Sequence, residues 1–362
     1  MNDDEVDVLA DDAVFRRGLP HVANATIMPG DDASLVLARL HAHLRQHDVS
    51  VRKLNDTLFV EMPDLSAALR LSDSNISVEI TAVDTDTLYF SKLWLEDAVS
   101  GACDGEGRIE WGENCRSSVL PPGLLVLTVA GVEDLSPKNR RITFRTSHAA
   151  SFDRADRIHL RLMLNFQEVT ASVIRSDANG EPRADHPKPL WRTYTISSVD
   201  SVAGTINVEF LLHGANGPGA DWARQAKPLD RVGATGPIGK ALRPARSYLL
   251  AGDETALPAI RRLIASLDET VTVKLVVEVA TQQDTIPMES KAMIETRWLY
   301  RGKQGSASIL PDVLRTMEIP AASSRRFVWA ACEADAAKRI RSVLSDRGVK
   351  PEEQLVAAYW HR

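Results

Sequence analysis

The sequence predicts a small α+β module, then an antiparallel β-barrel, then an α/β domain built on a parallel sheet. Short alternating runs and amphipathic helices fill the first hundred residues or so. Short strands at close spacing, broken by Gly and Pro, are typical of a barrel. From Ser247 onward apolar strands alternate with helices, which indicates a parallel sheet. The expected parts are an acidic tail (1–20), the α+β module (21–104), a linker (105–122), the barrel (123–246) and the α/β domain (247–362).

The bulk composition is that of an ordinary globular protein, with 44% apolar and 25% charged residues. A net charge of −6 argues against a nucleic-acid-binding surface. No apolar run reaches membrane-spanning length and no signal peptide is visible, so we expect a cytosolic monomer without stable membrane insertion. The three cysteines are expected to be free thiols. Cys103 and Cys115 flank a Gly-rich loop and leave contact with iron open, but an iron–sulfur cluster needs four ligands.

The first module contains two predicted helices, over 33–47 and 84–98, the second capped by Asp84 or Thr85. Four strands are expected between them, over 50–54, 58–62, 67–71 and 76–81. His41 and His43 suggest a metal site, but side chains two apart on a helix point in different directions. A structural role is the favoured reading of this pair.

Seven strands are predicted for the barrel, over 124–129, 141–145, 158–164, 168–176, 190–196, 206–212 and 230–233. Within it, Arg192-Thr193-Tyr194-Thr195 has the chemistry to bind a flavin. An Arg suits a phosphate, a Tyr offers a flat face to a ring, and a Thr hydroxyl can donate to a ring nitrogen. Gly217-Pro218-Gly219 then opens a helix over 220–226, whose free backbone N–H groups suit a pyrophosphate.

The α/β domain is predicted to begin with a strand over 248–251, the turn Gly252–Thr255 and a helix over 256–267. Strands over 271–280, 327–331 and 355–360 and a helix over 334–344 complete the pattern. The G-x-G-x-x-G fingerprint is absent, and Gly233, Gly236 and Gly239 are interpreted as turn glycines. A small-residue turn at the carboxyl end of a strand nevertheless lets a dinucleotide lie across the sheet.

Six ordered motifs resemble the siderophore-interacting proteins, which are FAD-dependent ferric-siderophore reductases. They are Arg192-x-Tyr194-Thr195, the segment from His213-Gly214 through Gly217-Pro218 to Trp222-Ala223, Gly236-Pro237-x-Gly239, Leu250–Ala259, Trp329–Glu333 and Ala357–His361. The resemblance implies a ferredoxin-reductase-like arrangement of FAD-binding barrel and nucleotide-binding sheet. The first module is similar to a domain of unassigned function fused to such reductases.

The resemblance also implies site residues. Arg192 would bind an FAD phosphate, Tyr194 would pack on the isoalloxazine and Thr195 would bond near its reactive edge. The rest of FAD would be held by His213, Gly217, Gly219, Ala220 and Trp222. The nicotinamide nucleotide would lie against Gly252, Asp253, Glu254, Thr255 and Glu333. Tyr359 and Trp360 would cover the flavin, the alternative being a buried aromatic plug.

Members of this family often carry a basic triad that attracts an anionic ferric siderophore. The position that matches in the barrel is His159, which is flanked by Arg157 and Arg161, and Lys240 lies two residues beyond Ile238; these four are the expected substrate-binding residues. The chain departs from the pattern at Ile238 and Leu355, where relatives carry basic residues, and at Cys332, where Gly is frequent. These departures leave the charge preference for the substrate open.

The implied activity is NAD(P)H-driven, FAD-dependent reduction of a ferric siderophore with release of Fe(II). NADPH is favoured over NADH because the Tyr-Trp-His ending resembles NADPH-using members. Arg297 and Arg301 are candidates for its 2′-phosphate, although solvated surface charges are the favoured interpretation of both. Two alternatives remain: a flavin reductase for another acceptor, such as a quinone, and a siderophore-binding flavoprotein with little reductase activity.

Overall fold

The structure is a computed structural model that describes residues 19–30, 32–46, 49–112, 120–136, 138–174, 187–212, 217–240, 242–302, 307–322 and 325–361. The predicted flavin residue His213, Cys115 and most of the expected acidic tail lie outside these ranges. The chain divides into two compact units, Met1–Leu124 and Leu125–Arg362, and each is described by itself.

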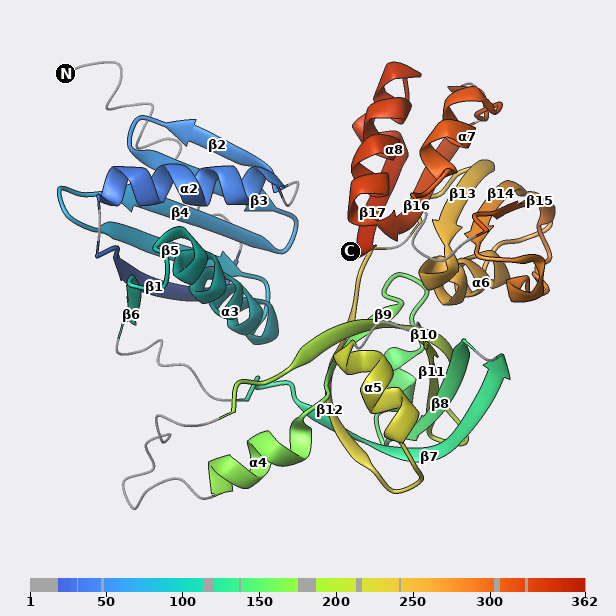
Figure 1. Cartoon of the computed structure of the whole chain (residues 1–362), viewed down its shortest axis with the longest axis horizontal. Coiled ribbons are helices and arrows are strands. Elements are labelled where there is room, and N and C mark those ends of the chain that lie inside the picture. The colour runs from blue at the N-terminus through green and yellow to red at the C-terminus, as the bar shows by residue number, and fades with distance from the viewer. Residues whose placement is uncertain are drawn as a thin grey trace. The chain divides into compact units, whose positions relative to one another are not determined.

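The first unit is an antiparallel sheet of strand order β2-β3-β4-β5-β1-β6, and α2 and α3 lie against one face of it (Figure 1). Its elements are β1 (His21–Met28), α2 (Ala33–Gln46), β2 (Val51–Leu54), β3 (Thr57–Met62), β4 (Leu65–Leu71), β5 (Ile76–Ala82), α3 (Thr85–Ala102) and β6 (Arg108–Trp111). Alternate strand residues, such as Leu58, Val60 and Val78, meet the apolar stripe of α2 and form the core.

Two strands of this unit were not predicted. β1 lies between β5 and the edge strand β6, and β6 pairs with it inside the segment expected to be a linker. Ile109 packs against the core, and the indole N–H of Trp111 donates to Glu96 Oε1 at 2.8 Å. The expected start of α3 is confirmed, because the Asp84 side chain accepts from Thr87 N.

The second unit begins with a closed barrel of strand order β10-β11-β8-β7-β12-β9, all antiparallel. Its elements are β7 (Leu125–Ser136), β8 (Asn139–Arg145), β9 (His159–Met163), α4 (Phe166–Ile174), β10 (Trp191–Asp200), β11 (Thr205–Leu211), α5 (Pro218–Gln225) and β12 (Arg231–Ile238). Phe144, Phe210 and Leu160 are fully buried in its interior. The six-stranded barrel confirms the predicted fold class of this region.

The strand predicted over 168–176 is wrong, because the chain forms the helix α4 there. Phe166 and Val169, three residues apart, are both buried, which fits a helical period. The hydroxyl of Thr170 donates to the carbonyl of Phe166 four residues back at 2.7 Å. β-branched residues favoured a strand locally, and tertiary packing overrode that preference.

The α/β part holds a parallel sheet of order β15-β14-β13-β16-β17. Its elements are β13 (Ser247–Asp253), α6 (Leu257–Ala265), β14 (Thr272–Val279), β15 (Met293–Tyr300), α7 (Leu310–Thr316), β16 (Arg326–Glu333), α8 (Ala334–Asp346) and β17 (Gln354–Trp360). α6 packs on one face, and α7 and α8 pack on the other. In chain order the strands run 3-2-1-4-5, so the order reverses between β13 and β16, where open α/β sheets bind ligands.

Among the described residues, no helix combines the length and the apolar character needed to cross a membrane.

Candidate functional site

Arg192 and Tyr194 lie two residues apart in the first half of β10, so they share one face of the strand. The Arg192 side chain is exposed, and its NH1 donates to the Trp191 carbonyl at 2.7 Å. Tyr194 is half-buried, with its ring centroid 4.3 Å from that of Phe210. Burial raises the pKa of the Tyr194 phenol to about 12, so the group stays protonated. A cation and a flat aromatic ring therefore stand next to each other on the barrel.

The hydroxyl of Tyr194 lies against the start of α5. A Cβ added to Gly219 would stand 1.8 Å from Tyr194 Oη, so only glycine fits there. Gly217 is the N-cap residue and brings no side chain to the first backbone N–H groups of the helix. Asp221, in the first turn, is paired with Arg224 at 2.8 Å. The helix start thus offers backbone donors beside Tyr194, on the strand face that also carries Arg192, which suits a phosphate group.

The other residues expected at this helix are more deeply placed. Ala220 is buried, and Trp222 is half-buried. The Trp222 ring stacks on Phe144 at 6.1 Å and contacts Phe210 at 5.7 Å. Trp222 therefore fixes α5 to the barrel core.

Thr195 points to the opposite side of β10 from Tyr194 and is buried, close to Tyr359 from the end of β17. Tyr359 Oη lies 2.7 Å from His159 Nε2 on β9. A Cβ on Gly239 would come within 2.7 Å of His159 Nδ1, so Gly239 leaves room for the imidazole. Burial, together with the charge of Arg262, lowers the pKa of His159 to about 4. His159 is therefore neutral at pH 7 and lends no positive charge to this surface.

Asp253 connects three strand ends at the point where the strand order reverses. Its Oδ1 accepts from Thr255 N at 2.9 Å and Thr255 Oγ1 at 2.5 Å. Its Oδ2 accepts from Glu333 N at 3.1 Å and from the indole Nε1 of Trp360 at 2.8 Å. Burial raises the pKa of Asp253 to about 6. Because both carboxylate oxygens are bonded within the protein, Asp253 orients Trp360 at this edge of the sheet.

Gly252 is fixed by packing at the same place. An added Cβ would meet Ala256 Cβ at 2.5 Å and Ala331 O at 2.9 Å, so β13, β16 and the following turn can approach only with glycine there. Glu333 accepts from Asp335 N at 3.0 Å and Ala336 N at 3.2 Å, and so caps α8.

Glu254 and Arg301 belong to a buried ionic network that the sequence did not reveal. Arg301 bonds to Glu254 and, at 3.0 Å, to Oε1 of Glu278. The Glu278 side chain is fully buried, and its Oε2 accepts from Ser308 Oγ at 2.7 Å and Leu310 N at 3.1 Å, at the start of α7. The expectation that Arg301 meets a 2′-phosphate is therefore corrected, since its guanidinium bonds two carboxylates.

The basic residues predicted to meet the substrate lie close to His159 or Gly239 in the chain. Arg161 is half-buried on β9, on the same face as His159, and Arg157 and Lys240 are exposed. These three side chains carry positive charge although the chain as a whole carries −6.

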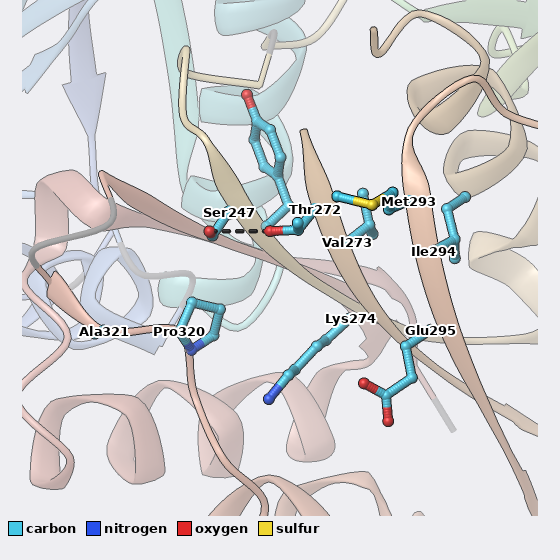
Figure 2. Close-up of a pocket in the computed structure, with 10 residues that line it drawn as sticks. Ser247, Thr272, Val273, Lys274, Met293, Ile294, Glu295, Pro320 and Ala321 are labelled. Atoms are coloured by element: carbon cyan, nitrogen blue, oxygen red, sulfur yellow. Dashed lines mark hydrogen bonds between the residues drawn. The ribbon is translucent and has the colours of Figure 1, made fainter. Parts of the chain in front are cut away.

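A hollow of about 540 Å³ lies at the opposite, amino-terminal edge of the parallel sheet. Figure 2 shows the hydrogen bond between Ser247 and Thr272 in its lining, which is 3.0 Å long. Lys274, in the same lining, pairs with Glu318. Ligands of such sheets bind at the carboxyl ends of the strands. This hollow is therefore separate from the candidate nucleotide site.

A closed antiparallel barrel followed by a parallel sheet of order 3-2-1-4-5 is the arrangement of ferredoxin-reductase-like flavoproteins. Residues 128–241 match the family described as "Siderophore-interacting FAD-binding domain", and residues 245–362 match "Siderophore-interacting protein". The chain belongs to the siderophore-interacting protein family.

Its relatives agree with this membership. The uncharacterized protein Rv2895c of Mycobacterium tuberculosis is 30% identical over 191 residues, covering 51% of this chain and 67% of that protein. The ferric vibriobactin reductase ViuB of Vibrio cholerae is 24% identical, covering 48% of this chain and 66% of ViuB. The mycobactin import ATP-binding/permease protein IrtA of M. tuberculosis is 30% identical, and the match spans only 24% of IrtA.

The crystal structure of a siderophore utilization protein from T. fusca has a TM-score of 0.56 at 31% identity, covering 66% of this chain and 93% of that one. SipS from Aeromonas hydrophila has a TM-score of 0.55 at 24% identity, covering 66% and 92% of the two chains, which indicates the same fold.

Proposed function

We propose that this protein is an oxidoreductase that uses NAD(P)H and bound FAD to reduce ferric siderophores and release Fe(II) in the cytosol. The observation that carries the proposal is the placement of Arg192, Tyr194 and the open start of α5 in one unit with the reversal point of a parallel sheet. The reductase activity named for the relative ViuB supports it.

The residues present fit FAD. Arg192 and the N–H groups after Gly217 would hold its phosphates, and Tyr194, seated in the space that Gly219 leaves, would pack on its ring. His213 is proposed to hold the remainder of FAD with these groups. Bound FAD supplies the chemistry that takes a hydride and gives single electrons to an acceptor.

The chain's own contribution is positioning and exclusion of water. Asp253 holds the indole of Trp360, and neutral His159 holds the phenol of Tyr359, so the last aromatic pair of β17 is fixed from both sides. Thr195 lies buried beside Tyr359, and its hydroxyl is proposed to hydrogen-bond near the reactive edge of the isoalloxazine. The turn Gly252–Thr255 is proposed to receive the nicotinamide nucleotide, with Glu254 and Glu333 nearby.

The ferric siderophore is proposed to meet the rim of Arg157, Arg161 and Lys240. Each exposed charge contributes little alone, but together they steer an anionic ligand. Changing Arg161 and Lys240 together to Glu should raise KM for an anionic ferric siderophore, most at low salt, and leave flavin reduction unchanged. An unchanged KM at both low and high ionic strength would place the substrate elsewhere.

The decisive experiment is anaerobic trapping of Fe(II) by ferrozine, with NADH or NADPH and a panel of ferric siderophores. Stopped-flow bleaching of the flavin by the reduced nucleotide separates a reductase from a protein that only binds siderophores. A flavin that bleaches without any Fe(II) release would point to another acceptor, such as a quinone. A purified protein that is colourless and binds neither FAD nor FMN would refute the proposal.

A further inference from the structure

One arginine of the α/β part inserts into the barrel. Arg262 lies on α6, and its NH1 donates to the Ile196 carbonyl at 2.7 Å. Its NH2 donates to the carbonyls of Phe152 at 3.0 Å and Arg154 at 2.9 Å. A single planar guanidinium therefore holds three backbone groups that come from two separate segments of the barrel.

The carbonyl acceptors of Arg262 lie close to the predicted flavin motif, and its helix follows the predicted nucleotide turn. Ile196 directly follows Thr195 on β10, where the strand pairing shifts register between Ile196 and Ser198. At its other end, α6 starts at Leu257, immediately after the turn that begins at Gly252. Arg262 thus connects the strand that carries the flavin motif to the helix that follows the candidate nucleotide turn.

Burying the charged guanidinium of Arg262 costs free energy, so the contact is stable only when its hydrogen bonds are formed. Desolvation lowers the pKa of Arg262, yet an arginine stays charged at neutral pH. Charge-assisted bonds to three carbonyls compensate for that burial only when their geometry is met. Next to it, Arg261 bonds to Glu209 on β11 at 3.2 Å, and that carboxylate is fully buried. The two arginines hold α6 against neighbouring barrel strands.

We propose that Arg262 is a positioning residue that sets the separation between the flavin-binding strand and the nucleotide-binding turn, and so the distance over which hydride is transferred. This role rests on the proposed function. Hydride transfer requires near-contact geometry, and a displacement of about 1 Å can lower a rate about 100-fold. Arg262 touches neither FAD nor nucleotide in this proposal and acts through β10.

The test compares Arg262→Met and Arg262→Lys with a matched control, Arg347→Met. Arg347, the residue directly after the end of α8, also donates to backbone carbonyls, those of Leu314 and Met317, but within the α/β part. In Arg262→Met, the rate constant of flavin reduction at saturating nucleotide should fall at least about tenfold. The affinities of this variant for FAD and for nucleotide should not change. Arg262→Lys should recover part of the rate, and Arg347→Met should keep all of it.

A second measurement does not depend on turnover. Spin labels at the exposed positions Val202, in the barrel, and Met293, on β15, report the separation of the two parts in a background without other cysteines. The distance distribution should broaden or shift in Arg262→Met and stay as in the wild type in Arg347→Met.

The outcomes separate this proposal from the function it rests on. A wild-type flavin that neither NADH nor NADPH bleaches would defeat the proposed function, while the spin-label distances would still test the positioning. Wild-type distances and rate in Arg262→Met would overturn the positioning role. An equal loss of rate in Arg347→Met would also overturn it, because the effect would then be general destabilisation.

Discussion

Replacing Glu278 with Gln should strongly destabilise the α/β part, because it removes the buried charge that Arg301 faces. The Glu278 side chain is 0% exposed and that of Arg301 is 13% exposed, so water replaces little of the lost interaction. Breaking a buried ion pair costs about 3–5 kcal/mol. Arg301 keeps its bond to Glu254, which places the expected loss in the free energy of unfolding near the lower end, about 3 kcal/mol.

The assay is urea denaturation of the full chain, followed by circular dichroism and with denaturant slopes compared between variants. Lys274→Gln is the control, because Lys274 lies on the same strand and pairs with Glu318, whose side chain is 84% exposed. That pair faces solvent, so its loss should produce no measurable shift. A Glu278→Gln protein that unfolds at the wild-type urea concentration would refute the assigned role of the network.

Three further outcomes are expected. Between pH 6.5 and about 4, His159 is protonated in the unfolded chain but not in the native chain, so the free energy of unfolding of the wild type falls as the pH is lowered, by at most about 1.4 kcal/mol per pH unit from this group. His159→Gln should lack this contribution, and urea midpoints of the variant and the wild type that change in parallel with pH would contradict it. Gly219→Ala should weaken FAD binding about tenfold or more, because the added methyl group collides with Tyr194. Gly101→Ala is the control, because no atom lies within 4 Å of a Cβ added there, and its affinity for FAD, measured by fluorescence titration, should not change. A chain lacking residues 1–120 should fold and elute as one sharp peak in size-exclusion chromatography. A chain lacking only residues 1–104 should aggregate through β6, whose partner strand β1 is then missing.

The sequence predicted the three kinds of architecture because their signals are local. Short alternating runs, Gly and Pro breaks and the change of period at Ser247 each lie within about ten residues. β6 was not predicted because its alternating pattern covers only four residues inside a Gly-rich segment, and the strand gains its stability by pairing with β1. The helix α4 was not predicted because its β-branched residues favour a strand locally, and the burial of Phe166 and Val169 stabilises the helix only in the folded protein.

The site was predictable in its motifs and not in its internal bonds. The order Arg192, Tyr194, Thr195 predicts flavin binding from the chemistry of its side chains, and the small-residue turn at Gly252 predicts dinucleotide binding. The partners of Glu278 and Arg262 could not be predicted, because they lie 23 and 66 residues away or more and become neighbours only in the folded chain. A charged residue inside an apolar strand, as Glu278 is, was the one available sign of a buried pair.

Ile158 joins the barrel to the hydrophobic core of the α/β part. This barrel residue is 2% exposed and belongs to the apolar cluster of α6 and the parallel sheet, while its own carbonyl accepts from Ile196 N at 2.8 Å. The two family regions meet between residues 241 and 245, yet the hydrophobic core crosses that border. Melting should therefore be a single cooperative event for residues 125–362. A chimera that exchanges one half between relatives would need to carry Ile158 and its α6 neighbours together, so the unit that packs as one core is larger than either matched region.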